Sequence, residues 1–107
     1  MLLCVDVGNT QIALGLYPEP ADDSEPHPPL VRDWRMRTDP RMTADELEVA
    51  VGALLGRHSG SITGVAALST VPSLLRELRI LLERRGDPAV VVGPGVRTGV
   101  PLLVDNP

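Results

Sequence analysis

The stretch VDVGNT contains residue types that suit phosphate chemistry, namely Asp6, Gly8, Asn9 and Thr10. A glycine lets the main chain approach a ligand, and main-chain N–H groups with the Asn9 and Thr10 side chains can donate to phosphate oxygens. Asp6 would repel a phosphate unless a cation stood between them, and Mg²⁺ held by Asp6 directly or through water would meet this need. The alternative is a plain hairpin turn, because aspartate, glycine and asparagine favour turns in any case.

Two strands must position this turn. The run Leu2–Val7 is apolar at nearly every position, which predicts a central strand covered on both faces, with Cys4 as an inert, buried thiol. After the turn, apolar residues alternate with smaller ones, as expected of a second strand. The connection is short, so we expect the two strands to pair antiparallel.

A third strand follows Pro18–Pro29, a segment rich in proline and acid that we interpret as a mobile loop. Alternation in LVRDWRMRT predicts one face toward the core and one toward solvent. The expected core face comprises Leu30, Trp34 and Met36, and the solvent face carries Asp33, Arg35 and Arg37. The following RTDPR stretch is interpreted as a polar loop with a surface ion pair and is assigned no role.

Helix signals frame the rest of the chain. Thr43 and Glu46 predict a capping box, with Gly60 as the stop of that helix. Pro72 opens a second helix that ends at Gly86, with an apolar stripe expected at Leu75, Leu78 and Leu82. The runs 62–69 and 89–92 predict buried strands. The sequence therefore predicts one α/β domain, β-β-β-α-β-α-β, with helices packed on a five-stranded mixed sheet in the order 3-2-1-4-5.

Composition excludes several classes of function. The 107 residues carry a net charge of -4 and a pI near 5.0, which argues against a nucleic-acid partner or an anionic membrane surface. The chain has no lysine, so neither a Walker A loop nor Schiff-base chemistry is available. Cys4 is the only cysteine and no signal peptide or membrane span is evident, so we expect a soluble protein of the reducing cytoplasm.

The terminal stretch GPGVRTG is not a dinucleotide fingerprint, because its glycines fall at 93, 95 and 99 with Pro94 between them. On its shape alone it is a tight loop leaving a buried strand. With one cysteine and the scattered His27 and His58, a zinc site is not expected.

The strand order and the position of the first turn resemble the first half of the sugar-kinase, Hsp70 and actin superfamily, a ribonuclease-H-like fold. More narrowly, the chain resembles the N-terminal part of type III pantothenate kinases. Four segments carry the resemblance and span nearly the whole chain: VDVGNTQIALGL, WRMRTDPRMTADEL, STVP and GPGVRTGVPLLVDNP. Gln11 stands where many members have asparagine, and Thr70 where many have valine.

The resemblance implies ATP-dependent phosphorylation of pantothenate to 4'-phosphopantothenate, the first step of coenzyme A biosynthesis, by a cytoplasmic homodimer that uses Mg²⁺ and a monovalent cation (K⁺ or NH₄⁺). It implies that Asp6 organises Mg²⁺. It implies a substrate pocket bordered by Gly95, Arg97 and Thr98. The implied nucleotide-binding residues are Asp6, Val7, Gly8, Asn9, Thr10, Gln11, Ile12 and Ala13.

In the family, a glycine-x-aspartate-arginine segment with the proposed general base follows shortly after the position of Pro107. We therefore expect residues 1–107 to be an N-terminal actin-like domain without the second domain and without a catalytic base, inactive alone. The alternative is a non-catalytic accessory module of the same family, of the transcriptional accessory type. The coding sequence after Pro107 would distinguish the two.

Overall fold

A computed structural model describes residues 1–19 and 29–93. Its elements in chain order are β1 (Leu2–Val7), β2 (Gln11–Tyr17), β3 (Arg32–Arg37), α1 (Ala44–Leu55), the 3₁₀ helix η1 (Gly56–Ser61), β4 (Gly64–Ser69), α2 (Pro72–Arg85) and β5 (Ala89–Val92). Neither α1 nor α2 is long and apolar enough to cross a membrane. Most of the predicted loop at 18–29, and with it the predicted mobility, lies outside the described residues.

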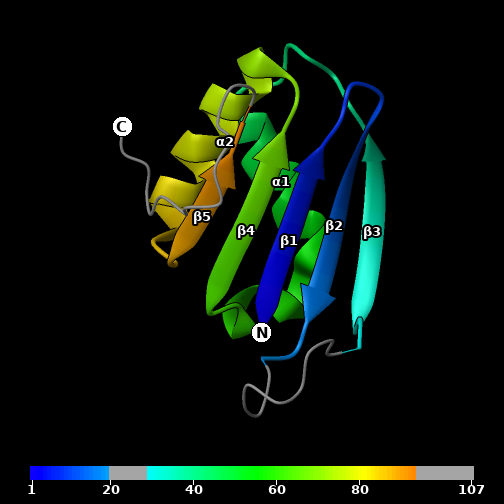
Figure 1. Ribbon diagram of the computed structural model, residues 1–107, viewed down its shortest axis with the longest axis vertical. Helices are drawn as coiled ribbons and strands as arrows, with labels where there is room; N and C mark the ends of the chain where they lie inside the picture. The colour runs from blue at the N-terminus through cyan, green and yellow to red at the C-terminus, as the bar shows by residue number, and fades with distance from the viewer. Residues whose placement is uncertain (20–28, 94–107) are drawn as a thin grey trace.

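The strands form one sheet in the order β3-β2-β1-β4-β5, as the sequence predicted (Figure 1). β1 is central and pairs antiparallel with β2 and parallel with β4. The short β1–β2 connection permits only the antiparallel pairing, whereas the connections through α1 and α2 return the chain in the same direction. The parallel strands β1, β4 and β5 therefore end at the same edge of the sheet, beside the first turn (Figure 1).

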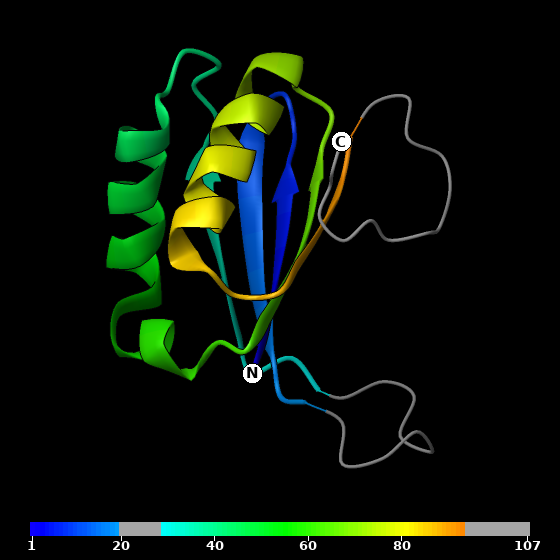
Figure 2. The ribbon, with the colours of Figure 1, turned by 90° about the vertical axis from the view of Figure 1, so that its left-hand side faces the viewer.

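Both helices pack on one face of the sheet (Figure 2). The two crossovers, β3 to β4 and β4 to β5, run in the same direction across the sheet. Because such crossovers are right-handed, they place α1 and α2 on the same side. The core lies between this face and the helices, and its most deeply buried apolar side chains are Val7, Leu3, Ile12, Leu14, Leu16, Leu47, Leu55, Leu74 and Leu78.

The prediction that β1 is covered on both faces is therefore wrong. Only alternate β1 side chains are buried, and Cys4 is exposed on the face opposite the helices, not buried in the core. On β4 the same face exposes Ala66 and Leu68, the latter with 41% of its surface accessible. Leu30 was also predicted in the core and is 46% exposed, because β3 begins only at Arg32. We refer to this uncovered side of the sheet as the open face.

The start of α1 matches its prediction, and its end does not. The Thr43 hydroxyl accepts the N–H of Glu46 at 3.1 Å, and the Glu46 carboxylate accepts the N–H of Thr43 at 3.0 Å. Such a cap contributes about 1 kcal/mol. The helix ends at Leu55, not near Gly60, because Gly56 takes a positive φ of 53° and the chain tightens into η1. Positive φ is a conformation that glycine adopts without a Cβ penalty.

Polar contacts join the two helices. The Glu77 carboxylate on α2 accepts the main-chain N–H of Ala44, the first residue of α1, at 2.8 Å. Near the C-terminal end of α2, Arg84 lies 2.6 Å from Asp45 and 3.1 Å from Glu48. Of the predicted stripe of α2, Leu78 and Leu82 are buried and Leu75 is only partly buried, while Leu74 and Leu81, expected to flank the stripe, are buried as well. The helix stops as predicted at Gly86, whose φ is 81°.

Candidate functional site

The turn between β1 and β2 is closed by a hydrogen bond from the Gly8 N–H to the carbonyl oxygen of Gln11, 3.0 Å long. Asn9 and Thr10 form its exposed tip. A Cβ added at Gly8 would lie only 3.2 Å from the Gln11 carbonyl oxygen, which is tighter than an ordinary contact. The φ of Gly8 is not positive, so the close approach within the turn, and not the backbone conformation, is what favours glycine at this position.

Two threonines, each directly after another strand, bond to this turn and to the end of β1 beside it. Thr38, directly after β3, donates its N–H to the Thr10 carbonyl oxygen at 3.0 Å and its hydroxyl to the Gly8 carbonyl oxygen at 2.9 Å. On the other side, Thr70 donates its N–H to the Val7 carbonyl oxygen at 3.1 Å. Thr38 is only 9% exposed, so little water competes for its hydrogen bonds. The turn is thus fixed from both flanks before any ligand binds.

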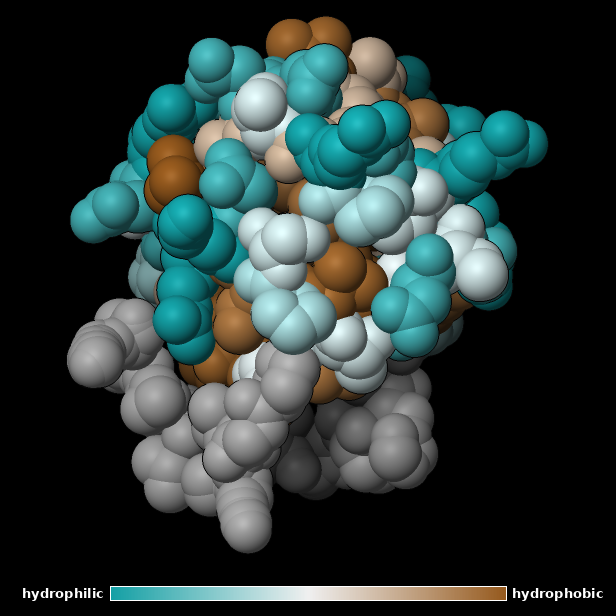
Figure 3. Space-filling model, turned by 90° about the horizontal axis from the view of Figure 1, so that it is seen from above, coloured by the Kyte–Doolittle hydropathy of each residue, from teal (hydrophilic) through white to brown (hydrophobic). Residues whose placement is uncertain are grey.

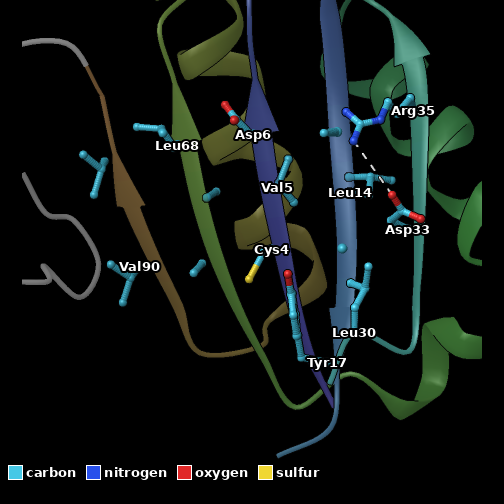
Figure 4. A pocket seen from close by; sticks show the side chains of 15 residues that line it. Cys4, Val5, Asp6, Leu14, Tyr17, Leu30, Asp33, Arg35, Leu68 and Val90 are labelled. Carbon is cyan, nitrogen blue, oxygen red and sulfur yellow. Dashed lines mark ion pairs between the residues drawn. The ribbon is translucent and has the colours of Figure 1, made fainter. Parts of the chain in front are cut away.

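Asp6 lies on the open face. It is the last residue of β1 before the turn whose side chain points away from the helices. It pairs with Ala13 on β2 and Leu68 on β4, and its carboxylate points toward the β4 side of β1 (Figure 4). Within residues 1–19 and 29–93 its carboxylate makes no hydrogen bond or ion pair. Its oxygen atoms are therefore accessible to a hydrated cation.

The Asp6 carboxylate fits a bound Mg²⁺. This ion usually takes one or two carboxylates from the protein and completes its shell with water and phosphate oxygens. No group of three or more His, Cys, Asp or Glu side chains that could cage a metal occurs in the described part of the chain. A metal at Asp6 would therefore take most of its remaining ligands from water and from a phosphate-bearing ligand.

The predicted nucleotide-binding residues fall into two groups. Val7 and Ile12 point into the core and are almost completely buried, so only their main-chain atoms are near the turn. The others are at least partly exposed at the turn or on the open face: Asp6, Gly8, Asn9, Thr10, Gln11 and Ala13. The predicted substrate residues Gly95, Arg97 and Thr98 lie outside the described residues.

Ser69 and Thr70 lie between the end of β4 and the start of α2, where a hydroxyl could contact a ligand or cap the helix. The Ser69 side chain is completely buried, and its hydroxyl accepts the Val71 N–H and donates to the Val71 carbonyl oxygen, both at 3.1 Å. The Ser69 hydroxyl therefore holds the main chain of Val71, the residue directly before α2. Sequence reasoning missed the contact of Thr38 with the turn, although a threonine directly after a strand that flanks the hairpin was an available signal.

Small residues in the middle of the open face leave a shallow hollow of about 660 Å³ (Figure 4). Cys4, Ala13, Gly15 and Ala66 contribute little side-chain volume to this face. Tyr17 and Leu30 border one end of the hollow, and Asp6 lies toward the end that faces the turn. The apolar surroundings raise the pKa of the Cys4 thiol above its usual value, although part of the side chain is exposed.

The edge of the sheet that carries the turn is mostly hydrophilic, with smaller hydrophobic areas between the polar residues (Figure 3). It combines a fixed turn, an accessible carboxylate and the carboxyl ends of parallel strands, the edge where open α/β sheets bind ligands. Residues 2–107 match the family described as type III pantothenate kinase. The chain belongs to the type III pantothenate kinase family.

Curated type III pantothenate kinases are closely similar to this chain. The protein from Saccharopolyspora erythraea is 67% identical over 110 residues, which cover 100% of this chain and 41% of that protein. The protein from Rhodococcus erythropolis is 63% identical over 109 residues, with 100% and 39% covered. The chain thus spans about two fifths of the length of these type III pantothenate kinases.

Solved structures share the fold at low sequence identity. RuvC of Thermus thermophilus aligns with a TM-score of 0.62 at 21% identity, covering 87% of this chain and 61% of RuvC. A putative N-acetylglucosamine kinase from Porphyromonas gingivalis aligns with a TM-score of 0.56 at 18% identity, covering 87% and 34%. These neighbours confirm the ribonuclease-H-like, actin-like fold expected of a type III pantothenate kinase and indicate nothing about its chemistry.

Proposed function

We propose that this chain is the nucleotide-binding, N-terminal actin-like domain of an enzyme that transfers the γ-phosphoryl group of ATP to pantothenate. Membership of the type III pantothenate kinase family supports the reaction. The observation that carries the site is the β1–β2 turn, which Thr38 and Thr70 hold from both flanks beside the accessible carboxylate of Asp6.

In this proposal, the main-chain N–H groups of the turn and the side chains of Asn9 and Thr10 bind phosphate oxygens of ATP. Asp6 positions Mg²⁺, which neutralises charge on the phosphates when bound. Phosphoryl transfer depends mostly on positioning and on charge stabilisation, so a turn that is rigid before binding favours the reaction. Val7 and Ile12 take part only by anchoring the turn in the core.

The proposal extends to features that follow from the family resemblance alone. They are a pantothenate pocket at Gly95, Arg97 and Thr98, a monovalent cation (K⁺ or NH₄⁺), a homodimer and a cytoplasmic location. The proposed general base belongs to a segment that follows Pro107 in the family. In this proposal, residues 1–107 bind and orient the nucleotide. The general base for phosphoryl transfer comes from a segment that the relatives have and that this chain does not span.

The test is the Asp6→Asn variant of a protein that contains this chain and is as long as the relatives. Its activity is assayed by ADP release in the presence of pantothenate. Loss of the metal-organising charge should lower the rate at least about a hundredfold. Asp45→Asn, which removes the same charge from the helix-covered side, is the matched control and should stay within about twofold. Retention of activity by Asp6→Asn within a few-fold would refute the metal role.

A further inference from the structure

A second hollow, of about 330 Å³, lies beside the β1–β2 turn on its β2–β3 side. It is lined by Thr10, Gln11, Arg35, Met36 and Arg37. Gln11, the first residue after the turn, pairs directly with Arg37, and Ala13 pairs with Arg35. Two guanidinium groups therefore stand next to the turn, on strand positions fixed by the sheet register.

These guanidinium groups have little internal competition for their donors. Arg35 lies 3.9 Å from Asp33, and both side chains are more than half exposed (Figure 4). An exposed pair at this distance contributes little. Arg37 makes no ion pair within the described ranges 1–19 and 29–93. Arg35, with one weak exposed pair, and Arg37 therefore keep most of their donors for a ligand, in a chain whose net charge is -4.

The sheet register also relates these cations to Asp6. Arg35, Ala13 and Asp6 occupy one row across β3, β2 and β1 on the open face. Strands lie about 4.8 Å apart, so roughly 10 Å separates the Cα atoms of Arg35 and Asp6. The small side chain of Ala13 leaves the space between them open. An anionic group above β2 would thus have the turn at its end, the Arg35 position on one side and the Asp6 position on the other.

We propose that Arg35 and Arg37 bind the phosphate chain of the nucleotide on the side of the turn opposite Asp6. The proposal rests on the function proposed above and adds two phosphate-binding residues to it. Mg²⁺ at Asp6 neutralises only part of the charge of a triphosphate, and the rest requires other cations. Arginine suits this position because its planar guanidinium donates two parallel hydrogen bonds to phosphate oxygens.

Binding of sodium tripolyphosphate and of Mg²⁺-ATP to the 107-residue chain tests the proposal directly. Titration calorimetry gives the dissociation constants, and the Nε–Hε resonances of Arg35 and Arg37 report contact with the anion. The variants are Arg35→Gln, Arg37→Gln and the double variant. Arg57→Gln is the matched control, because η1 precedes β4 and lies at the end of the sheet away from the turn.

Each variant should weaken tripolyphosphate binding about three- to tenfold, and the Arg57→Gln control should match the wild-type chain. Added salt should weaken the wild-type chain more than the double variant. Adenosine, which has no phosphate, should bind all variants equally. Dispersed amide spectra establish that each variant is folded.

Two results would overturn the proposal. One is equal tripolyphosphate affinity in the wild-type chain and the folded double variant. The other is no shift of either arginine resonance at about ten times the expected millimolar dissociation constant. Neither result bears on the Asp6→Asn kinase assay. The arginine proposal can therefore fail while the proposed function holds, and the two failures are told apart because they come from different assays.

Discussion

Thr38 donates its hydroxyl to the carbonyl oxygen of Gly8 at 2.9 Å, although 30 residues separate the two in the chain. This bond links the end of β3 to the turn proposed to bind phosphate. With the N–H of Thr38 bonded to the carbonyl oxygen of Thr10, it makes the turn part of the sheet instead of a free loop. Thr38 is therefore a positioning residue, since it acts on a ligand only through the turn.

Replacement of Thr38 by valine should lower the free energy of unfolding by about 1 kcal/mol, because the shape is kept and one hydrogen bond is lost. Thr38→Ser keeps the hydroxyl and is the control, which should retain most of the stability. Urea denaturation followed by the fluorescence of Trp34 measures both. Equal stability of the valine variant and the wild-type chain would mean that water satisfies the Gly8 carbonyl oxygen just as well.

Glu77 should stabilise α1 from outside that helix. Glu77→Ala leaves the N–H of Ala44 without its acceptor and should cost about 1 kcal/mol, whereas Glu77→Gln keeps an acceptor oxygen and should cost less. Thermal unfolding of the three chains separates the hydrogen bond from the charge. If the alanine and glutamine variants were equally destabilised, the effect would come from the charge at the helix N-terminus.

The Cys4 thiol should react slowly with iodoacetamide at neutral pH, because its apolar neighbours raise its pKa and lower the thiolate fraction. The rate should rise with pH and reach half its maximum above the pH found for a free cysteine. A profile equal to that of free cysteine would contradict the raised pKa.

The same pKa shift should make stability depend on pH. In the unfolded chain the Cys4 thiol loses its proton at the usual pKa, whereas in the folded chain it keeps the proton to a higher pH. Between the two pKa values the unfolded state therefore binds fewer protons than the folded state. The free energy of unfolding should therefore fall as pH rises through the range between the two pKa values. Cys4→Ser should remove this part of the dependence, as measured by urea denaturation at a series of pH values.

The 107-residue chain alone should bind Mg²⁺-ATP no tighter than about 1 mM, equivalent to roughly 4 kcal/mol, and should not phosphorylate pantothenate. A half-open site does not exclude water, which weakens the electrostatic interactions that promote phosphoryl transfer. Calorimetry and an ADP-release assay measure these two properties. Turnover that disappears in Asp6→Ala would show that a general base lies within the chain.

Local patterns predicted most of the fold. The alternation in β2, the capping box of Thr43 and the short turn at Gly8 are signals within a few residues, and connection lengths then fix the strand order. Which face of the sheet is covered depends on the direction of both crossovers together. An apolar run such as Leu2–Val7 does not carry that information, and the burial of Cys4 was predicted wrongly for this reason.

The residues of the candidate site also differ in whether a local sequence pattern reveals them. Asp6 and Asn9 are recognisable because their residue types and spacing suggest phosphate and metal binding. The contact of Thr38 with the turn is set by the pairing of β2 with β3, so no short motif contains it. Arg35 and Arg37 alternate with the buried Trp34 and the partly buried Met36, as ordinary solvent-facing side chains do. Their position beside the turn becomes visible only when the register is known.

The central position of β1 has a consequence for how the chain acquires its shape during synthesis. β1 is made early, but its parallel partner β4 comes much later, and the residue that secures the end of β1, Thr70, follows Val7 by 63 positions. Pairings between distant segments form slowly, because a long loop must close first. We therefore expect the edge of β1 that pairs with β4 to stay unpaired until β4 has been synthesised.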